Sequence, residues 1–65
     1  MSVFYTVSFK RHICSYKYET IYFHYLSNAK EFYKNTDNAC EPRKVITSKE
    51  NYEKLNNGWN IVWGD

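Results

Sequence analysis

The first part of the chain alternates between apolar and polar residues with a period of two. Within residues 3–13, one face would carry Val3, Tyr5, Val7 and Phe9, and the other face would carry Thr6, Ser8, Lys10 and His12. A period of two with one apolar face is typical of a half-buried strand. Residues 19–26 are rich in β-branched and aromatic side chains, which predicts a second strand.

The connection between these two predicted strands lies within residues 10–18 and contains neither Gly nor Pro. A turn near residues 15–18 is favoured, and a turn at residues 10–12 fits nearly as well. In either register the connection is short, so we expect the two strands to pair antiparallel.

A helix is predicted to follow, because Ser27 or Asn28 can cap it and Glu31 lies three residues after Asn28, as in a capping box. Its apolar stripe consists of Ala29, Phe32 and Tyr33. The polar residues 35–38 compete for the backbone and should end the helix. A loop closed by Pro42 then leads to a short third strand at residues 43–47.

A second helix is predicted from the sequence Thr47-Ser48-Lys49-Glu50, which fits the capping box that begins with Thr47. The helix should run to about Asn56 with Tyr52 and Leu55 facing inward. Asn57-Gly58 should supply a left-handed residue that ends it.

The last residues alternate again, with Trp59, Ile61 and Trp63 on one face, which predicts a fourth strand. At least one of the two tryptophans is expected to pack against Phe32 or Tyr52. The sequence thus predicts a single α+β domain over residues 1–65. It should be a small two-layer sandwich of order ββαβαβ, with a mostly antiparallel four-stranded sheet and two short helices.

Composition adds an excess of aromatic side chains to this fold. The 65 residues include seven Tyr, four Phe and two Trp, against ten Val, Ile and Leu together. So small a core cannot enclose thirteen rings, so some should lie at the surface, where tyrosine suits a half-wet partner contact. The alternative is that tyrosine fills strand positions, where it is favoured anyway.

Charge is modest but unevenly placed. The net charge is +2, which is low for a dedicated nucleic-acid-binding protein, yet residues 1–18 contain three bases and no acid. This end could offer a basic patch for phosphate or for an acidic protein surface. Solvated lysines at strand ends are the other interpretation.

The candidates for chemistry are few. The only soft metal ligands are His12, Cys14, His24 and Cys40, and they lack the close pairing of a zinc site. Two cysteines without an export signal suggest free thiols, although a disulfide between them stays open. No glycine-rich turn offers an oxyanion or phosphate site, so we expect no metal, no cofactor and no enzymatic activity.

The predicted partner-binding residues gather in and beside the first connection. They are Lys10, Arg11, Tyr16, Lys17, Tyr18, Tyr22 and His24. Aromatic rings beside basic residues can stack on bases near phosphates, or they can form a protein-contact edge.

No apolar run is long enough to span a membrane, and the N-terminus lacks a basic region followed by an apolar stretch. We therefore expect no signal peptide and a cytoplasmic protein, in the cytoplasm of the host cell if it is encoded by a phage.

Two segments carry a resemblance to a known class of proteins. Residues 22–33 and 45–55 each form a predicted strand that runs into a capped helix, and Phe, Tyr, Asn, Lys and Ile, whose codons are AT-rich, make up 29 of the 65 residues. In this style the chain resembles small α/β proteins of phages and prophages from low-GC bacteria. Many of these bind and disable a host protein, including anti-CRISPR and other anti-defence inhibitors.

The resemblance implies a non-enzymatic inhibitor that occupies the surface of a host protein. A small nucleic-acid-binding regulator with the same basic, aromatic hairpin is the alternative. A third possibility is a structural subunit whose exposed rings form a homo-oligomer interface. A homodimer is expected, because the rings exceed what so small a core can cover and an edge strand with unpaired backbone groups invites a second copy or a partner.

Overall fold

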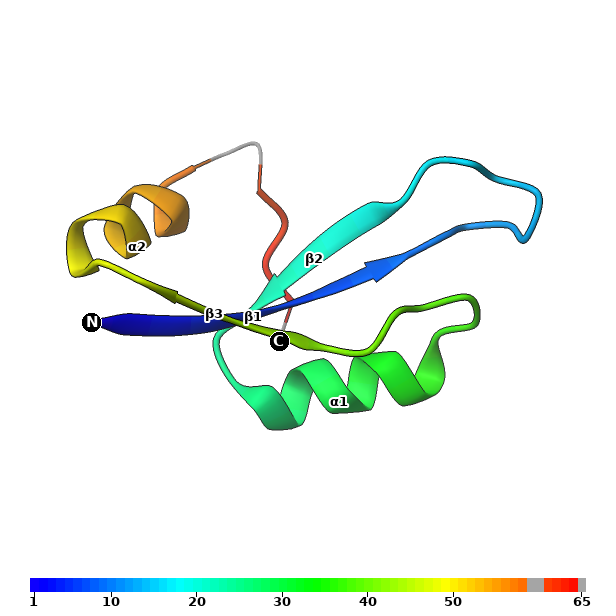
Figure 1. The fold of residues 1–65 in the computed structure, drawn as a ribbon, viewed down its shortest axis with the longest axis horizontal. Helices are drawn as coiled ribbons and strands as arrows, with labels where there is room; N and C mark the ends of the chain where they lie inside the picture. Colours follow the sequence, from blue (N-terminus) through cyan, green and yellow to red (C-terminus); the bar gives the residue numbers. More distant parts are fainter. Residues whose placement is uncertain (59–60, 65) are drawn as a thin grey trace.

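The computed structural model of the chain describes residues 1–58 and 61–64 (Figure 1). The elements follow one another as β1 (Ser2–Phe9), β2 (Glu19–Phe23), α1 (Leu26–Asn35), β3 (Arg43–Thr47) and α2 (Lys49–Asn56). The predicted α+β class is confirmed, and the predicted third strand has the observed bounds. No helix in the described part of the chain is long and apolar enough to cross a membrane.

The sheet has three antiparallel strands in the order β2-β1-β3, so the prediction of a four-stranded sheet is wrong. Of the proposed fourth strand, Trp59 and Asn60 lie outside the described residues. Trp63 forms only an isolated parallel bridge to Tyr22, through hydrogen bonds from Tyr22 N to Val62 O (2.9 Å) and from Gly64 N to Tyr22 O (2.7 Å). The alternation of the last residues therefore produces a short pairing at the outer edge of β2 and no full strand.

One face of the sheet packs against α1. Val7 of β1 lies opposite Ile21 of β2, and Tyr5 lies opposite Phe23, so these side chains share a face. Val7, Phe23 and Ala29 of α1 form the buried cluster there, and their partly buried neighbours are Tyr5, Ile21, Phe32 and Ala39. The apolar stripe of residues 3–9 predicted from the sequence is the floor of this core.

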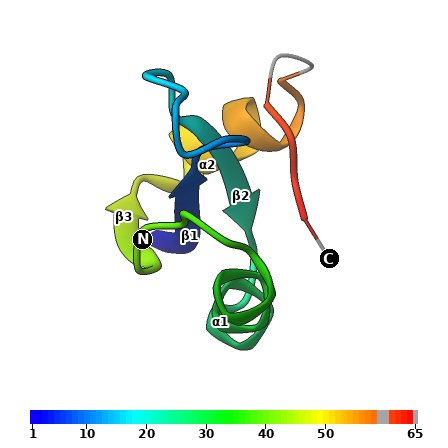
Figure 2. The same cartoon turned by 90° about the vertical axis from the view of Figure 1, so that its right-hand side faces the viewer.

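The other face is also covered, which corrects the two-layer arrangement. Successive side chains of a strand alternate between its two faces, so Phe4, three residues before Val7, lies on the opposite face. Phe4 is nevertheless only 4% exposed. Its ring stacks on Tyr22 (5.4 Å between centroids) and lies 6.3 Å from Tyr52 of α2 and 6.1 Å from Trp63. Figure 2 shows α1 and α2 on opposite sides of the sheet.

The strand ends differ from the expectation as well. β1 stops at Phe9 and β2 starts at Glu19, so nine residues connect them. The turn lies between the two sites weighed from the sequence, where Ser15 N donates to His12 O (3.0 Å). The connection is a protruding loop and not a tight hairpin turn.

Both helix starts are displaced by about one to three residues from the predicted caps. The N-cap of α1 is Tyr25, whose side chain makes no capping hydrogen bond, so Ser27 and Asn28 lie inside the helix. The N-cap of α2 is Ser48, whose Oγ accepts from Asn51 N (3.2 Å), and not Thr47. At the C-terminal end of α2, Gly58 does not have the positive φ that was predicted for it. Among the described residues the positive φ is that of Asn38 (59°), in the turn before β3.

Candidate partner-binding surface

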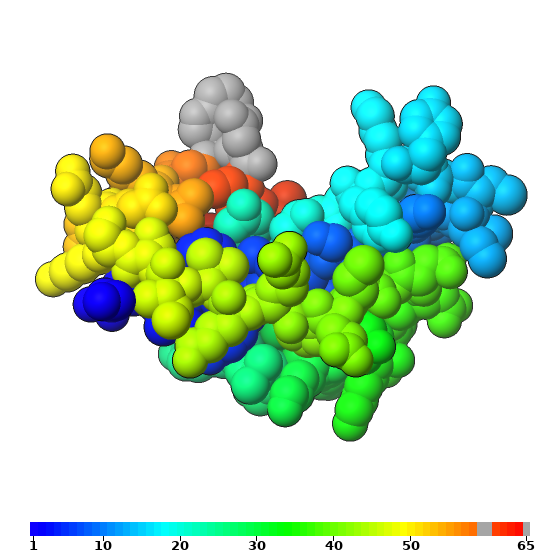
Figure 3. Space-filling view, viewed as in Figure 1, coloured from blue at the N-terminus to red at the C-terminus, as the bar shows by residue number. Residues whose placement is uncertain are grey.

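Residues 10–18 form the β1–β2 loop, which extends beyond the sheet at one end of the molecule (Figure 1). In the space-filling view its side chains, light blue to cyan, rise above the neighbouring surface (Figure 3). Five of the seven predicted partner-binding residues lie in this loop. The five are Lys10, Arg11, Tyr16, Lys17 and Tyr18.

The base of the loop is fixed to the segment that precedes β3. Lys10 N donates to Asn38 O (3.1 Å), and Cys40 N donates to Ser8 O (2.7 Å). These bonds flank an antiparallel bridge between Phe9 and Ala39. The left-handed backbone of Asn38 allows the chain to turn there, and asparagine tolerates this conformation better than most residues. The loop is therefore held to residues 38–40 where it leaves β1.

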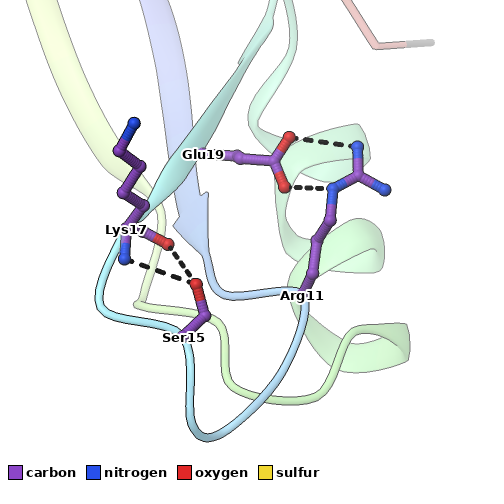
Figure 4. Close-up of polar contacts among 4 residues, drawn as sticks. All are labelled: Arg11, Ser15, Lys17 and Glu19. Carbon is purple, nitrogen blue, oxygen red and sulfur yellow. Dashed lines mark hydrogen bonds and ion pairs between the residues drawn. The ribbon is translucent and has the colours of Figure 1, made fainter.

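Arg11 and Glu19 form an ion pair across the base of the loop (Figure 4). Arg11 Nη2 also donates to Glu19 Oε1 at 3.0 Å, so the contact is bidentate. The hydrogen bond and then the charge of Glu19 raise the pKa of Arg11 above its ordinary value. Both side chains are exposed, so the pair orients the loop more than it stabilises the fold.

A second local contact shapes the outer half of the loop (Figure 4). Ser15 Oγ accepts from Lys17 N (3.3 Å) and donates to Lys17 O (3.2 Å). Such side-chain turns replace the glycine or proline that the loop lacks. They place Tyr16 at the outside of the bend, between the two bonded residues.

Lys10 and Tyr18 face each other at the start and the end of the loop. Lys10 Nζ lies 5.0 Å from the centroid of the Tyr18 ring, within the range of a cation–π contact. Of the five predicted residues in the loop, Lys10 and Tyr18 contact each other and Arg11 is paired with Glu19 of β2. Tyr16 and Lys17 project from the loop.

The most exposed apolar side chains of the loop are Ile13 and Tyr16, with exposed fractions of 77% and 90%. Ile13 is not among the predicted site residues. The signal that could have found it is a β-branched apolar residue within a polar connection, where it serves neither a strand nor a core. Together with Tyr16 it gives the loop an exposed apolar part, and Lys17 follows Tyr16 directly in the chain.

The two remaining predicted residues do not join this surface. Tyr22 lies in the middle of β2, half-buried between Phe4 and Trp63. The His24 ring stacks on Trp63 (4.1 Å between centroids, 5° between planes), and its Nδ1 is 2.6 Å from Tyr52 Oη. Both side chains therefore contribute to the second face of the sheet and not to the loop.

The cysteines are free and exposed, Cys14 in the loop and Cys40 before β3. Within residues 1–58 and 61–64, no three His, Cys, Asp or Glu side chains come together as metal ligands. The expectation that the chain binds no metal and no cofactor stays a prediction from its sequence.

The comparisons with known proteins add no relative. No family model, no curated protein and no solved structure matches the chain.

Proposed function

We propose that this protein is a small non-enzymatic binding protein, encoded by a phage or another mobile element, that inhibits a host defence protein by occupying its surface. The observation that carries the proposal is the exposed apolar part of the β1–β2 loop, Ile13 and Tyr16. A loop that exposes two large apolar side chains gains nothing from them within its own fold. Insertion into a pocket of a partner would bury both.

The framework of the loop supports this use. Its base is bonded to residues 38 and 40, and Arg11 is paired with Glu19, so part of the ordering cost is met before binding. Tyrosine adds large contact area at a low conformational cost because it has only two side-chain torsions. These features favour a preformed ligand loop on a small scaffold.

Charge indicates the character of the partner's surface. Residues 10–19 contain three bases and one acid, and Lys17 is the direct neighbour of Tyr16 in the chain. The matching surface is an apolar pocket with an acidic rim, which would also speed association. A standard interface covers roughly 800 Å² on each partner, a fraction of the 5191 Å² that the chain exposes in all.

The test is capture of host proteins from a lysate of a low-GC bacterium, treated with nuclease, followed by measurement of affinity for each captured protein. Tyr16→Ala and Ile13→Ala should each weaken binding at least tenfold, because central apolar anchors dominate such interfaces. The matched control is Tyr25→Ala, whose side chain is 68% exposed outside the loop. Equal losses in loop and control variants would contradict the proposal.

Nucleic-acid binding is the outcome that would replace the proposal. With three bases in residues 1–18, the log–log salt slope of binding should be no steeper than roughly −3. The pairing of Arg11 with Glu19 weakens phosphate contacts further, so we expect no submicromolar binding to DNA or RNA at physiological salt. Tight, salt-sensitive binding that disappears when Lys10, Arg11 and Lys17 are changed would establish the regulator instead.

A further inference from the structure

A groove lies at the other side of β2, between α1 and the C-terminal segment of residues 61–64. Figure 2 shows this segment running beside β2 toward α1. The groove has a volume of about 380 Å³, within the lower part of the range of roughly 300–1,000 Å³ for ligand pockets. It is separate from the β1–β2 loop, so a ligand in the groove is independent of the function proposed for the loop.

The floor of the groove is apolar. Ile21 and Phe23 reach it from the α1 side of β2, Phe32 from α1 and Val62 from the C-terminal segment. The Phe23 and Phe32 rings pack at 5.5 Å between centroids, so the floor is a continuation of the buried core. The Phe23 ring is only 2% exposed, so the accessible floor consists of Ile21, Phe32 and Val62, an apolar surface that suits the methylene stem of a long side chain.

The rim along α1 is polar and carries one negative charge. Asn28, Glu31 and Asn35 also line the groove, and their spacing of three and four residues places them on one side of the helix. Within the described residues the ion pairs are Arg11–Glu19 and Lys54–Glu50, and Glu31 belongs to neither. The groove therefore presents a carboxylate between two carboxamides, above an apolar floor.

We infer that this groove binds an arginine side chain from an extended segment of a partner protein. The stem of the arginine would lie on Ile21, Phe32 and Val62, and the guanidinium would donate to Glu31 and to the carboxamide oxygens of Asn28 and Asn35. Arginine fits better than lysine because its planar fork can serve a carboxylate and a neighbouring amide at once. An acidic or purely apolar segment would leave Glu31 unpaired.

The experiment is a titration of the ¹⁵N-labelled protein with N-acetyl-Leu-Arg-amide, followed by two-dimensional NMR. The same peptide with citrulline in place of arginine is the control ligand, since citrulline keeps the shape and loses the charge. The backbone amides of Glu31, Asn35 and Gly64 should shift with the arginine peptide, and the citrulline peptide should bind at least fivefold more weakly. The variant Glu31→Gln should lose about fivefold in affinity for the arginine peptide.

The matched protein control is Glu53→Gln, an exposed glutamate on α2 outside the groove. It should bind the arginine peptide as the unchanged protein does. Both variants alter exposed side chains, and their far-UV circular dichroism checks that they fold. Equal affinity for the two peptides, no effect of Glu31→Gln, or shifts confined to residues 10–18 would each overturn the arginine site. None of these results would bear on the loop, whose test uses Ile13 and Tyr16.

Discussion

At the scale of single residues, Gly64 shows how closely the C-terminal segment approaches the sheet. A Cβ atom built at this position would overlap the ring of Phe23, with the ring's Cζ only 2.8 Å away. Phe23 is buried against Val7 and Ala29, so its ring has no room to withdraw. The glycine is therefore needed for its lack of a side chain and not for its backbone freedom.

We predict that Gly64→Ala displaces the C-terminal segment and lowers the free energy of unfolding by roughly 1–3 kcal/mol, the usual cost of overpacking. Urea denaturation measures the loss. Gly58→Ala is the matched control, because its added Cβ would lie 3.3 Å from Leu55 O and 3.4 Å from Lys54 O. Its effect should be clearly smaller, and equal effects would mean that the approach to Phe23 does not hold the segment in place.

The sequence predicts residues whose environment depends on local spacing and misses those whose environment depends on distant segments. Alternation within their own strands places Val7 and Phe23 on the core face. Phe4 lies on the face that the pattern marks as polar, and it is buried only because Tyr52 and Trp63 arrive from far along the chain. The contact of Trp63 with Tyr52 (6.2 Å between centroids) is among the predicted ones, and its contacts with Phe4, Tyr22 and His24 are not.

At the scale of elements, the two helices begin in different ways. α2 starts with Ser48, whose hydroxyl accepts from Asn51 N, and Thr47 Oγ1 accepts from Asn51 Nδ2 at 2.7 Å. α1 starts at Tyr25 without a side-chain cap, and its first bond runs from Ala29 N to Tyr25 O (3.2 Å). Packing of Ala29 and Phe32 on the sheet fixes the start of α1, whereas the start of α2 depends on its cap.

We predict that Ser48→Ala lowers the free energy of unfolding by about 0.5–2 kcal/mol, because it leaves the Asn51 amide without its acceptor. Thermal or urea denaturation measures the change. Ser27→Ala is the matched control, since Ser27 lies within α1 and caps nothing. That variant should stay within about 0.5 kcal/mol of the unchanged protein. A larger loss for Ser27→Ala than for Ser48→Ala would restore the caps inferred from the sequence.

The sequence could not separate a true strand from a short bridge. Residues 43–47 and 61–63 each contain a pair of adjacent β-branched residues, yet of these described segments only the first pairs along its whole length with β1. The edge of β2 offers the last segment only the two bonds around Tyr22. Which edge is open depends on the sheet order, and an alternating pattern contains no information on that order.

At the scale of the whole molecule, the outer edge of β3 has no strand beside it in the described part of the chain. An antiparallel pair of two β3 strands centred on Val45 would place Lys44 opposite Ile46 and Arg43 opposite Thr47. No like charges would then face each other directly. The edge thus suits a second copy of the chain, which is the homodimer expected from the sequence.

We predict a dimer at high micromolar concentration by light scattering. Ile46→Lys should convert it to a monomer, because a charge on an exposed edge opposes pairing. Ile13→Lys alters an even more exposed isoleucine in the β1–β2 loop and should leave the dimer intact. A monomer mass for the unchanged protein would refute the dimer and leave the proposals for the loop and the groove unaffected.

The two-sided burial of β1 also sets the order in which a growing chain can fold on the ribosome. Val7, Phe23, Ala29 and Phe32 all lie in the first half of the sequence, so the α1 side can close early in synthesis. Phe4 and Tyr22 must wait for Tyr52 and Trp63. Since chains emerge N-terminus first, an aromatic sheet face stays open until Trp63 has left the exit tunnel. In that interval the nascent protein presents to chaperones a surface that the finished molecule keeps covered.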